Sequence, residues 1–187
     1  MIKNNSKKAY FYKMKTKLLI GCLLLAFIVS CKKETANSEV KKTEEISNIS
    51  IKSYSYDELK PLLEKKDDKI YVVNFWATWC APCVKELPYF EKINKEYASK
   101  NVEVLLVSLD FPRQVEKKLI PFIKKRNLQS KVVLLDDVNE DVWIKDIDST
   151  WSGAIPITII YNKDKRKFYE QSFTYESLES ELNKFIN

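Results

Sequence analysis

The ten residues Asn74-Phe75-Trp76-Ala77-Thr78-Trp79-Cys80-Ala81-Pro82-Cys83 join an apolar run to a helical pattern. Residues 70–75 are almost all apolar, which is typical of a strand buried on both faces. Residues 81–99 carry apolar side chains at helical spacing. Two cysteines three residues apart in a first helical turn lie close enough to form a disulfide. The stretch therefore predicts a cysteine pair at the junction of a buried strand and a helix.

The chemistry of this pair follows from its place at the start of a helix. The first amide groups of a helix lack partners within it and the helix dipole is positive there, so negative charge is stabilised. We expect this to lower the pKa of Cys80 in particular, which makes Cys80 the nucleophile. A zinc site needs about four ligands, but the chain has no histidine, and its two other cysteines, Cys22 and Cys31, lie in the N-terminal segment. An inert disulfide remains as the alternative.

Strands and helices alternate outside this stretch, from about Ile49 onward. The expected strands are a short edge strand at 49–51 and further strands at 70–75, 102–109, 131–135, 157–161 and 167–169. The expected helices cover 55–65, 81–99, 114–126 and 139–147, and a last helix follows its N-cap, Thr174. Pro61 leaves open a later start for the first of them. This alternation predicts an α/β fold, with a largely parallel sheet covered by helices on both faces and an antiparallel hairpin at its end.

The stretch at 74–83 resembles the active-site segment of thioredoxin-fold proteins. It is most similar to that of the lipoprotein and membrane-anchored disulfide reductases of the TlpA/ResA type. The similarity in segment order covers about residues 48–187, with sharp motif identity at 70–90 and 153–158. It implies a thioredoxin-like three-layer sandwich, in which helices flank a central mixed sheet. The helix at 114–126 and the strand at 131–135 resemble the central insertion of this group.

A second matching element is Gly153-Ala154-Ile155-Pro156-Ile157-Thr158, at the start of an expected strand. In thioredoxin-like proteins the matching proline is cis and faces the cysteines, and the residue before it pairs its backbone with an extended substrate. The resemblance therefore implies a cis bond at Pro156 and substrate binding at Ile155. Trp79 and Trp151 flank the two active segments, where they either line a substrate groove or pack in the core.

Two positions distinguish this chain from thioredoxins proper. Those proteins have a buried aspartate where this chain has Asn74, so that proton acceptor is missing. The TlpA/ResA-type proteins resemble this chain in having asparagine there and a glutamate three residues after the second cysteine, which maps to Glu86. Cys80, Cys83 and Glu86 follow one another at helical spacing, so the carboxylate can lie beneath Cys83. The implied role is proton handling, with an ordinary surface glutamate as the alternative.

Residues 1–30 predict a lipoprotein signal peptide, with Met14 as an alternative start. Three lysines precede an apolar run at 18–30, which is shorter than the ~20 residues of a spanning helix. Ile28-Val29-Ser30-Cys31 resembles the bacterial lipobox, in which the cysteine receives lipid on its sulfur. We therefore expect a lipid on Cys31, a flexible tether at 31–48, and a thioredoxin-like domain at 49–187 on the extracytoplasmic side of the membrane.

The formal net charge of +6 does not indicate a nucleic-acid partner. Six lysines and no acidic residue lie in residues 1–30, so the 26 basic residues of the remainder equal its 26 acidic residues. A domain of zero net charge does not have the excess of basic residues that is typical of proteins that bind a polyanion.

Together these features predict a thiol–disulfide oxidoreductase, and most simply a reductase of disulfides in envelope proteins. The Cys80–Cys83 pair would act without another cofactor or a metal. A thiol donor protein, for which a membrane-embedded protein is one candidate, would return the pair to the dithiol form. Reduction is favoured over oxidation because Ala81 and Pro82 offer a thiolate no charge and an ionised Glu86 opposes it. The alternatives are a disulfide-forming oxidase and a redox-inert binding domain. A peroxidase fits less well, because the expected mature chain has no separate peroxidatic cysteine before the pair.

Overall fold

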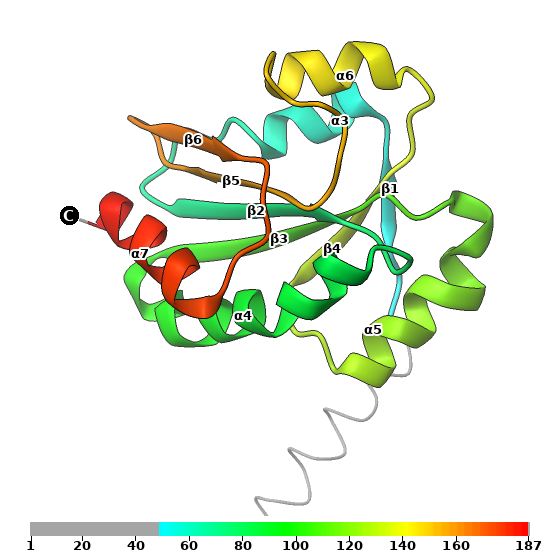
Figure 1. Cartoon of the computed structure of the whole chain (residues 1–187), viewed down its shortest axis with the longest axis horizontal. Helices are drawn as coiled ribbons and strands as arrows, with labels where there is room; N and C mark the ends of the chain where they lie inside the picture. The colour runs from blue at the N-terminus through cyan, green and yellow to red at the C-terminus, as the bar shows by residue number, and fades with distance from the viewer. Residues whose placement is uncertain (1–48, 187) are drawn as a thin grey trace, which may run out of the picture. The chain divides into compact units, whose positions relative to one another are not determined.

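The computed structural model describes residues 49–186 (Figure 1). Six strands form one sheet in the order β1-β4-β3-β2-β5-β6. The strands are β1 Lys52–Tyr54, β2 Ile70–Trp76, β3 Val102–Ser108, β4 Lys131–Leu135, β5 Ile157–Tyr161 and β6 Arg166–Tyr169. Strands β1, β4, β3 and β2 are parallel to one another. Strand β5 is antiparallel to β2, and β6 is antiparallel to β5. The predicted α/β fold with a mixed sheet is therefore confirmed.

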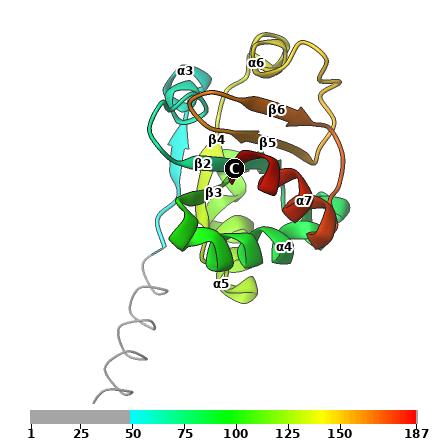
Figure 2. The same ribbon diagram turned by 90° about the vertical axis from the view of Figure 1, so that its left-hand side faces the viewer.

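Helices cover both faces of the sheet (Figures 1 and 2). One face carries α4 (Ala81–Tyr97), α5 (Ile120–Arg126) and α7 (Tyr175–Ile186), and the other carries α3 (Tyr56–Leu59) and α6 (Glu140–Ile147). The steps from β2 to β3 to β4 run in one direction across the sheet and place α4 and α5 on the same face. The step from β1 to β2 runs the other way and places α3 opposite, because such crossovers are right-handed.

The predicted insertion is formed by α5 and β4, which add a helix to the α4 face and a strand between β1 and β3. Its helix is less regular than the sequence pattern predicts. It opens with a 3-10 turn at Pro112–Gln114 and a π-helical turn at Val115–Leu119 before the α-helical part begins. Pro121 lacks the amide hydrogen that a regular helix would use here, so the preceding turns depart from α-helical geometry.

Two boundaries predicted near the start of the domain are wrong. The edge strand is β1 and not 49–51, because pairing with β4 places it, with Lys52 opposite Val133 and Tyr54 opposite Leu135. The following helix ends at Leu59 and continues only as a 3-10 turn, η1 Lys60–Leu62. That turn contains Pro61, which cannot donate the next α-helical hydrogen bond.

All seven residues of β2 are buried. Every second one belongs to the apolar cluster that includes side chains of α3 and α6, namely Tyr71, Val73 and Phe75. Asn74 and Trp76 alternate with these residues, so they face α4 and α5 on the other side of the sheet. Trp76 packs against Phe122 of α5 with ring centroids 5.5 Å apart. Asn74 is therefore a polar side chain within a fully buried strand.

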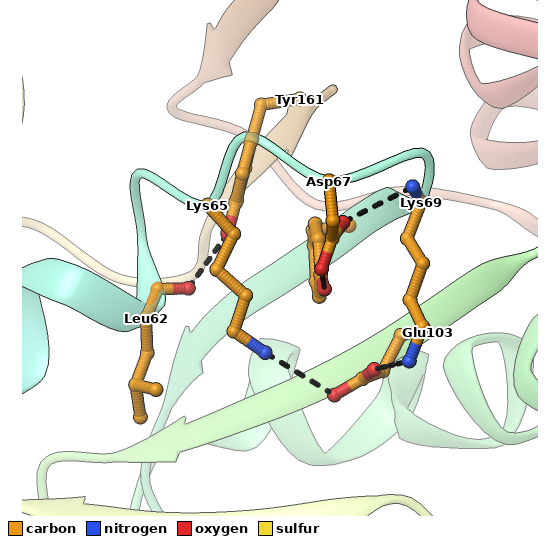
Figure 3. Close-up of polar contacts among 7 residues, drawn as sticks. Leu62, Lys65, Asp67, Lys69, Glu103 and Tyr161 are labelled. Atoms are coloured by element: carbon orange, nitrogen blue, oxygen red, sulfur yellow. Dashed lines mark hydrogen bonds and ion pairs between the residues drawn. The ribbon is translucent and has the colours of Figure 1, made fainter. Parts of the chain in front are cut away.

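Polar side chains form hydrogen bonds and ion pairs around the amino end of β2 (Figure 3). Glu103 of β3 accepts a hydrogen bond from Lys69 at 2.9 Å and lies 3.9 Å from Lys65. The hydroxyl of Tyr71 donates to Asp67 at 2.8 Å. The ion pairs are partly exposed, so solvent screens them. The polar side chains at this end of the strand are therefore partly solvated, and the cysteine pair follows the opposite end.

Candidate active site

Cys80 and Cys83 form a disulfide at the junction of β2 and α4, with their Cα atoms 5.3 Å apart. Cys80 is the N-cap of α4, and its sulfur accepts a hydrogen bond from the backbone N–H of Cys83 at 3.3 Å. Cys80 is 6% exposed and Cys83 is fully buried. An approaching reactant therefore reaches the outer sulfur, Cys80, whereas Cys83 is shielded. The backbone N–H on Cys80 would also stabilise a thiolate there.

Asp110 fixes the loop that carries the disulfide, and no sequence motif identifies it. Its carboxylate is buried and accepts hydrogen bonds from the backbone N–H of Thr78 at 3.0 Å and the Thr78 hydroxyl at 2.5 Å. It also accepts from the Ser108 hydroxyl at 2.8 Å. The signal that could have found it is its position just beyond β3, the parallel neighbour of β2. The loops after both strands therefore meet at one edge of the sheet.

The segment before β5 lies against the outer cysteine. The Ile155–Pro156 bond is cis, which confirms the predicted geometry. The carbonyl oxygen of Ile155 lies 3.7 Å from the sulfur of Cys80. Pro156 is buried and Ile155 is half-buried. Gly153 has a φ of +93°, a conformation that glycine adopts without the steric cost that a side chain would add.

The two tryptophans flanking these segments have different environments. Trp79 is 58% exposed, next to Cys80. Trp151 is fully buried, and its indole N–H donates to the carbonyl oxygen of Ala154 at 2.8 Å. Its ring also meets Phe75 edge-on, with centroids 5.7 Å apart. Trp151 therefore packs in the core and does not line a substrate groove, because its ring is also in contact with Trp143 and Phe168.

Glu86 is buried on the inner side of α4, with an exposed fraction of 1%. One carboxylate oxygen accepts a hydrogen bond from the Asn74 amide at 3.0 Å, and the other accepts from the backbone N–H of Phe173 at 2.7 Å. Burial raises the pKa of Glu86 from 4.5 to about 7, although both hydrogen bonds act in the opposite direction. The surface-glutamate alternative is therefore wrong.

The Asn74 amide group holds Glu86 in place from β2. Besides Glu86, its nitrogen donates to the backbone oxygen of Ile157 and to the hydroxyl oxygen of Thr158, each at 3.2 Å. Its own oxygen is buried and has no hydrogen-bond partner among the described residues. A buried carboxyl with a pKa raised to about 7 thus lies one helical turn after Cys83.

No three cysteine or acidic side chains in residues 49–186 gather in a way that could hold a metal ion. No helix in this part of the chain is both long enough and apolar enough to cross a membrane. The predicted signal peptide, the tether and the lipid-bearing Cys31 lie outside the described residues.

The sheet topology and the disulfide together define a thioredoxin-fold thiol–disulfide oxidoreductase. A secreted thiol-disulfide isomerase from Corynebacterium glutamicum shares the fold with a TM-score of 0.54 and 19% identity, over 64% of this chain and 72% of that one. A thiol:disulfide interchange protein of the thioredoxin family from Chlorobium tepidum also has a TM-score of 0.54, with 16% identity over 74% of this chain and 92% of that one.

Sequence comparison assigns the family. The AhpC/TSA family matches residues 37–166, so the chain belongs to this family. The thiol-disulfide oxidoreductase ResA of Oceanobacillus iheyensis is 29% identical over 185 residues, which cover 97% of this chain and 92% of that protein. ResA of Bacillus cereus is 32% identical over 128 residues, which cover 65% of this chain and 68% of that protein.

Proposed function

We propose that the chain is a thiol–disulfide reductase acting on disulfides in proteins of the bacterial cell envelope. The observation that carries this proposal is the asymmetric cysteine pair, with Cys80 at the accessible start of α4 and Cys83 buried behind it. The names of the ResA relatives support the same chemistry.

The reaction has two balanced steps. The Cys80 thiolate attacks one sulfur of the substrate disulfide, which forms a mixed disulfide and releases the other substrate sulfur as a thiolate. The Cys83 thiolate then attacks the sulfur of Cys80 and releases the second substrate thiolate, which takes a proton from solvent. The substrate gains two electrons, and the enzyme leaves as the Cys80–Cys83 disulfide. No cofactor beyond this disulfide is needed.

Glu86 is proposed to handle the proton of Cys83. The inner thiol must lose its proton before it attacks the mixed disulfide, and its burial excludes bulk water as a ready base. The buried Glu86 carboxyl has a pKa of about 7, so it can accept that proton near neutral pH. While it is ionised it also opposes a thiolate nearby, which favours the thiol form and a reducing potential.

Three residues are proposed to bind the substrate. The backbone of Ile155 lies against Cys80 and can pair with an extended segment on either side of the substrate cysteine. Pro156 fixes the course of that backbone beside the disulfide. The exposed Trp79 ring offers an apolar contact directly beside the nucleophile.

The reductase direction is tested by the reduction potential of the pair. The full chain is equilibrated with glutathione buffers of known potential, and the fraction of dithiol is read by thiol alkylation. We expect a value near that of thioredoxin, about −270 mV, and not near that of a strong oxidant, about −120 mV. A value at the oxidising end would assign the chain to disulfide formation. A pair that never cycles with dithiothreitol would instead indicate a redox-inert binding domain.

The electrons are proposed to come from another thiol protein, because the extracytoplasmic compartment is oxidising and lacks a reducing thiol pool. A membrane-embedded donor fits a tethered acceptor. Replacing Cys83 with serine and isolating the mixed disulfides from a whole-cell lysate identifies the substrates. A trapped population dominated by cytoplasmic proteins would contradict the envelope assignment.

The chain is proposed to be held at the membrane by lipid on Cys31. Each buried methylene contributes about 0.8 kcal/mol, so several acyl chains give stable attachment. Cys31→Ser should release the protein into the soluble fraction and leave disulfide exchange unchanged, because a tether separates anchor and catalyst. Fractionation, mass spectrometry and a thiol assay check this prediction. Membrane retention of the variant, or wild-type protein without lipid mass, would contradict it.

A further inference from the structure

Four large apolar side chains are exposed in residues 49–186, and all four follow parallel strands of the sheet. They are Trp79, Phe111, Val138 and Val142, with exposed fractions of 58, 53, 93 and 66%. Trp79 follows β2, Phe111 follows β3, and the two valines follow β4. Because β2, β3 and β4 are parallel neighbours, their carboxyl ends lie at one edge of the sheet, on the right in Figure 1.

The strand register places three of these residues at similar chain positions beyond the carboxyl ends of their strands. One row of paired residues crosses β2, β3 and β4 near their carboxyl ends, namely Trp76, Ser108 and Leu134. Trp79 and Phe111 each come three positions after this row, and Val138 comes four positions after it. Neighbouring strands lie about 4.8 Å apart, so the distance from the β2 loop to the β4 loop is roughly 10 Å. Val142 lies four residues after Val138, in the first turn of α6.

The loops that carry the two aromatic residues are tied to each other. Thr78 donates both its backbone N–H and its hydroxyl to Asp110. Trp79 and Phe111 directly follow these two residues in the chain. The guanidinium of Arg113 lies 5.7 Å from the centre of the Phe111 ring and supports it from one side. Hydrogen bonds thus connect the two loops that carry the aromatic residues. Such ordering before binding lowers the entropy cost of binding.

The chain around Val138 and Val142 is acidic. Residues 136–141 contain four carboxylates and no basic residue, namely Asp136, Asp137, Glu140 and Asp141. Backbone N–H groups of Tyr56 and Asn139 already bond Asp137. The other three are exposed, so they favour a positively charged group next to the valines.

We propose that Trp79, Phe111, Val138 and Val142 form an apolar row that docks an extended segment of the substrate protein. The segment carries apolar side chains beside its disulfide-bonded cysteine and a lysine or arginine further along. An extended chain advances about 3.3 Å per residue, so roughly 10 Å corresponds to three residues and the basic residue lies about four to six positions from the cysteine. This inference rests on the proposed function and names the substrate class for the same site.

The location of the row argues for a substrate segment over other occupants. The row begins at the residue next to Cys80, so whatever covers it must approach the disulfide. A second copy of the chain bound there would cover the nucleophile. The carboxylates at its far end repel an anionic lipid surface. A flexible substrate segment can contact the whole row while its cysteine reaches Cys80.

Short synthetic peptides with one cysteine in a mixed disulfide with glutathione test the proposal on the reduced full chain. One peptide has apolar residues after the cysteine and then a lysine, a second has serines in place of the apolar residues, and a third has glutamate in place of lysine. We expect the first to react about tenfold faster than the second and about threefold faster than the third. Phe111→Ser and the double variant Val138→Ser with Val142→Ser should each reduce the tenfold preference to about threefold or less.

The matched control is Lys95→Ser, at an exposed position of α4 that lies 12 residues after Cys83, and this variant should keep the full preference. Melting temperatures of all variants establish that they are folded. Equal rates for the three peptides with wild-type protein, or an unchanged preference in the row variants, would overturn the proposal. A wild-type dimer that Val138→Ser dissociates would also overturn it, in favour of a second copy. If the wild type reduces neither a peptide nor oxidised glutathione, the proposed function itself fails.

Discussion

The two ends of β2 use polar side chains in opposite ways. At the amino end, Lys69 and Glu103 form an ion pair that remains partly exposed (Figure 3). Near the carboxyl end, Asn74 holds the buried carboxyl of Glu86. Solvent screens the first pair, so the pair contributes little to stability. Burial makes the charge on Glu86 costly, so its pKa moves to about 7. Burial destabilises the charged form of Glu86, and Glu86 can therefore change its charge near neutral pH.

Replacing either cysteine with serine should have the largest effect on disulfide exchange, and the two variants should fail at different steps. Cys80→Ser should abolish disulfide exchange, because the accessible nucleophile is lost. Cys83→Ser should still attack a substrate disulfide but accumulate as a mixed disulfide, because nothing resolves it. Mass spectrometry after a single turnover measures both outcomes. Faster alkylation of Cys83 than of Cys80 in the reduced wild type would reverse the nucleophile assignment.

Removing the buried charge should change the kinetics at the carboxyl end of β2. Glu86→Gln keeps the shape and deletes the charge, so the cysteine pKa values should fall and the potential should become less reducing. Resolution of the mixed disulfide should nevertheless slow, by about tenfold to a hundredfold, because the proton acceptor is gone. Thiolate absorbance against pH and single-turnover resolution rates measure the two effects. Unchanged values for both would leave Glu86 a structural residue only.

The same substitution should change how stability depends on pH in the oxidised protein. The pKa of Glu86 is about 7 in the folded state and near 4.5 when unfolded. The folded state therefore binds this proton more tightly, and the stabilisation is complete below about pH 4.5 and lost as pH rises through about 7. The loss amounts to at most about 3 kcal/mol. Urea unfolding between these pH values should show this decline in wild type and not in Glu86→Gln.

The loop that holds the disulfide should depend on Asp110. Asp110→Ala leaves the Thr78 N–H and the Ser108 hydroxyl without their acceptor, which costs about 1–3 kcal/mol of unfolding free energy. Asp110→Asn keeps one oxygen acceptor and should lose less. Denaturant unfolding of the oxidised proteins measures the difference. Equal stability of the alanine and wild-type proteins would show that the loop does not need this anchor.

The smallest effect is expected at the amino end of β2. Glu103→Gln removes the charge that faces Lys65 and Lys69. Because both pairs are partly exposed, the melting temperature should fall by no more than about 3 °C, with a smaller difference at high salt. Disulfide exchange should be unaffected. A loss of activity here would mean that the two ends of β2 are coupled.

Short-range sequence patterns predict much of the fold and of the site. The cysteine pair at the end of an apolar run and the strands at 131–135 and 157–161 depend on short-range signals, and the structure has them at those positions. The cis bond at Pro156 was implied by family resemblance. The edge strand was misplaced because an edge strand has little pattern of its own, and its position follows from hydrogen bonds to β4.

The sequence by itself determined the chemistry of this protein: two cysteines at the start of a helix, a glutamate one turn further on, and an alternation of strands and helices that fits one fold. Only the tertiary structure decided which polar groups lose water. It buried Glu86 against Asn74 and Phe173, and it brought Asp110 to the disulfide loop. The reason is that desolvation depends on neighbours from distant parts of the chain, such as Phe173, which lies 87 positions after Glu86.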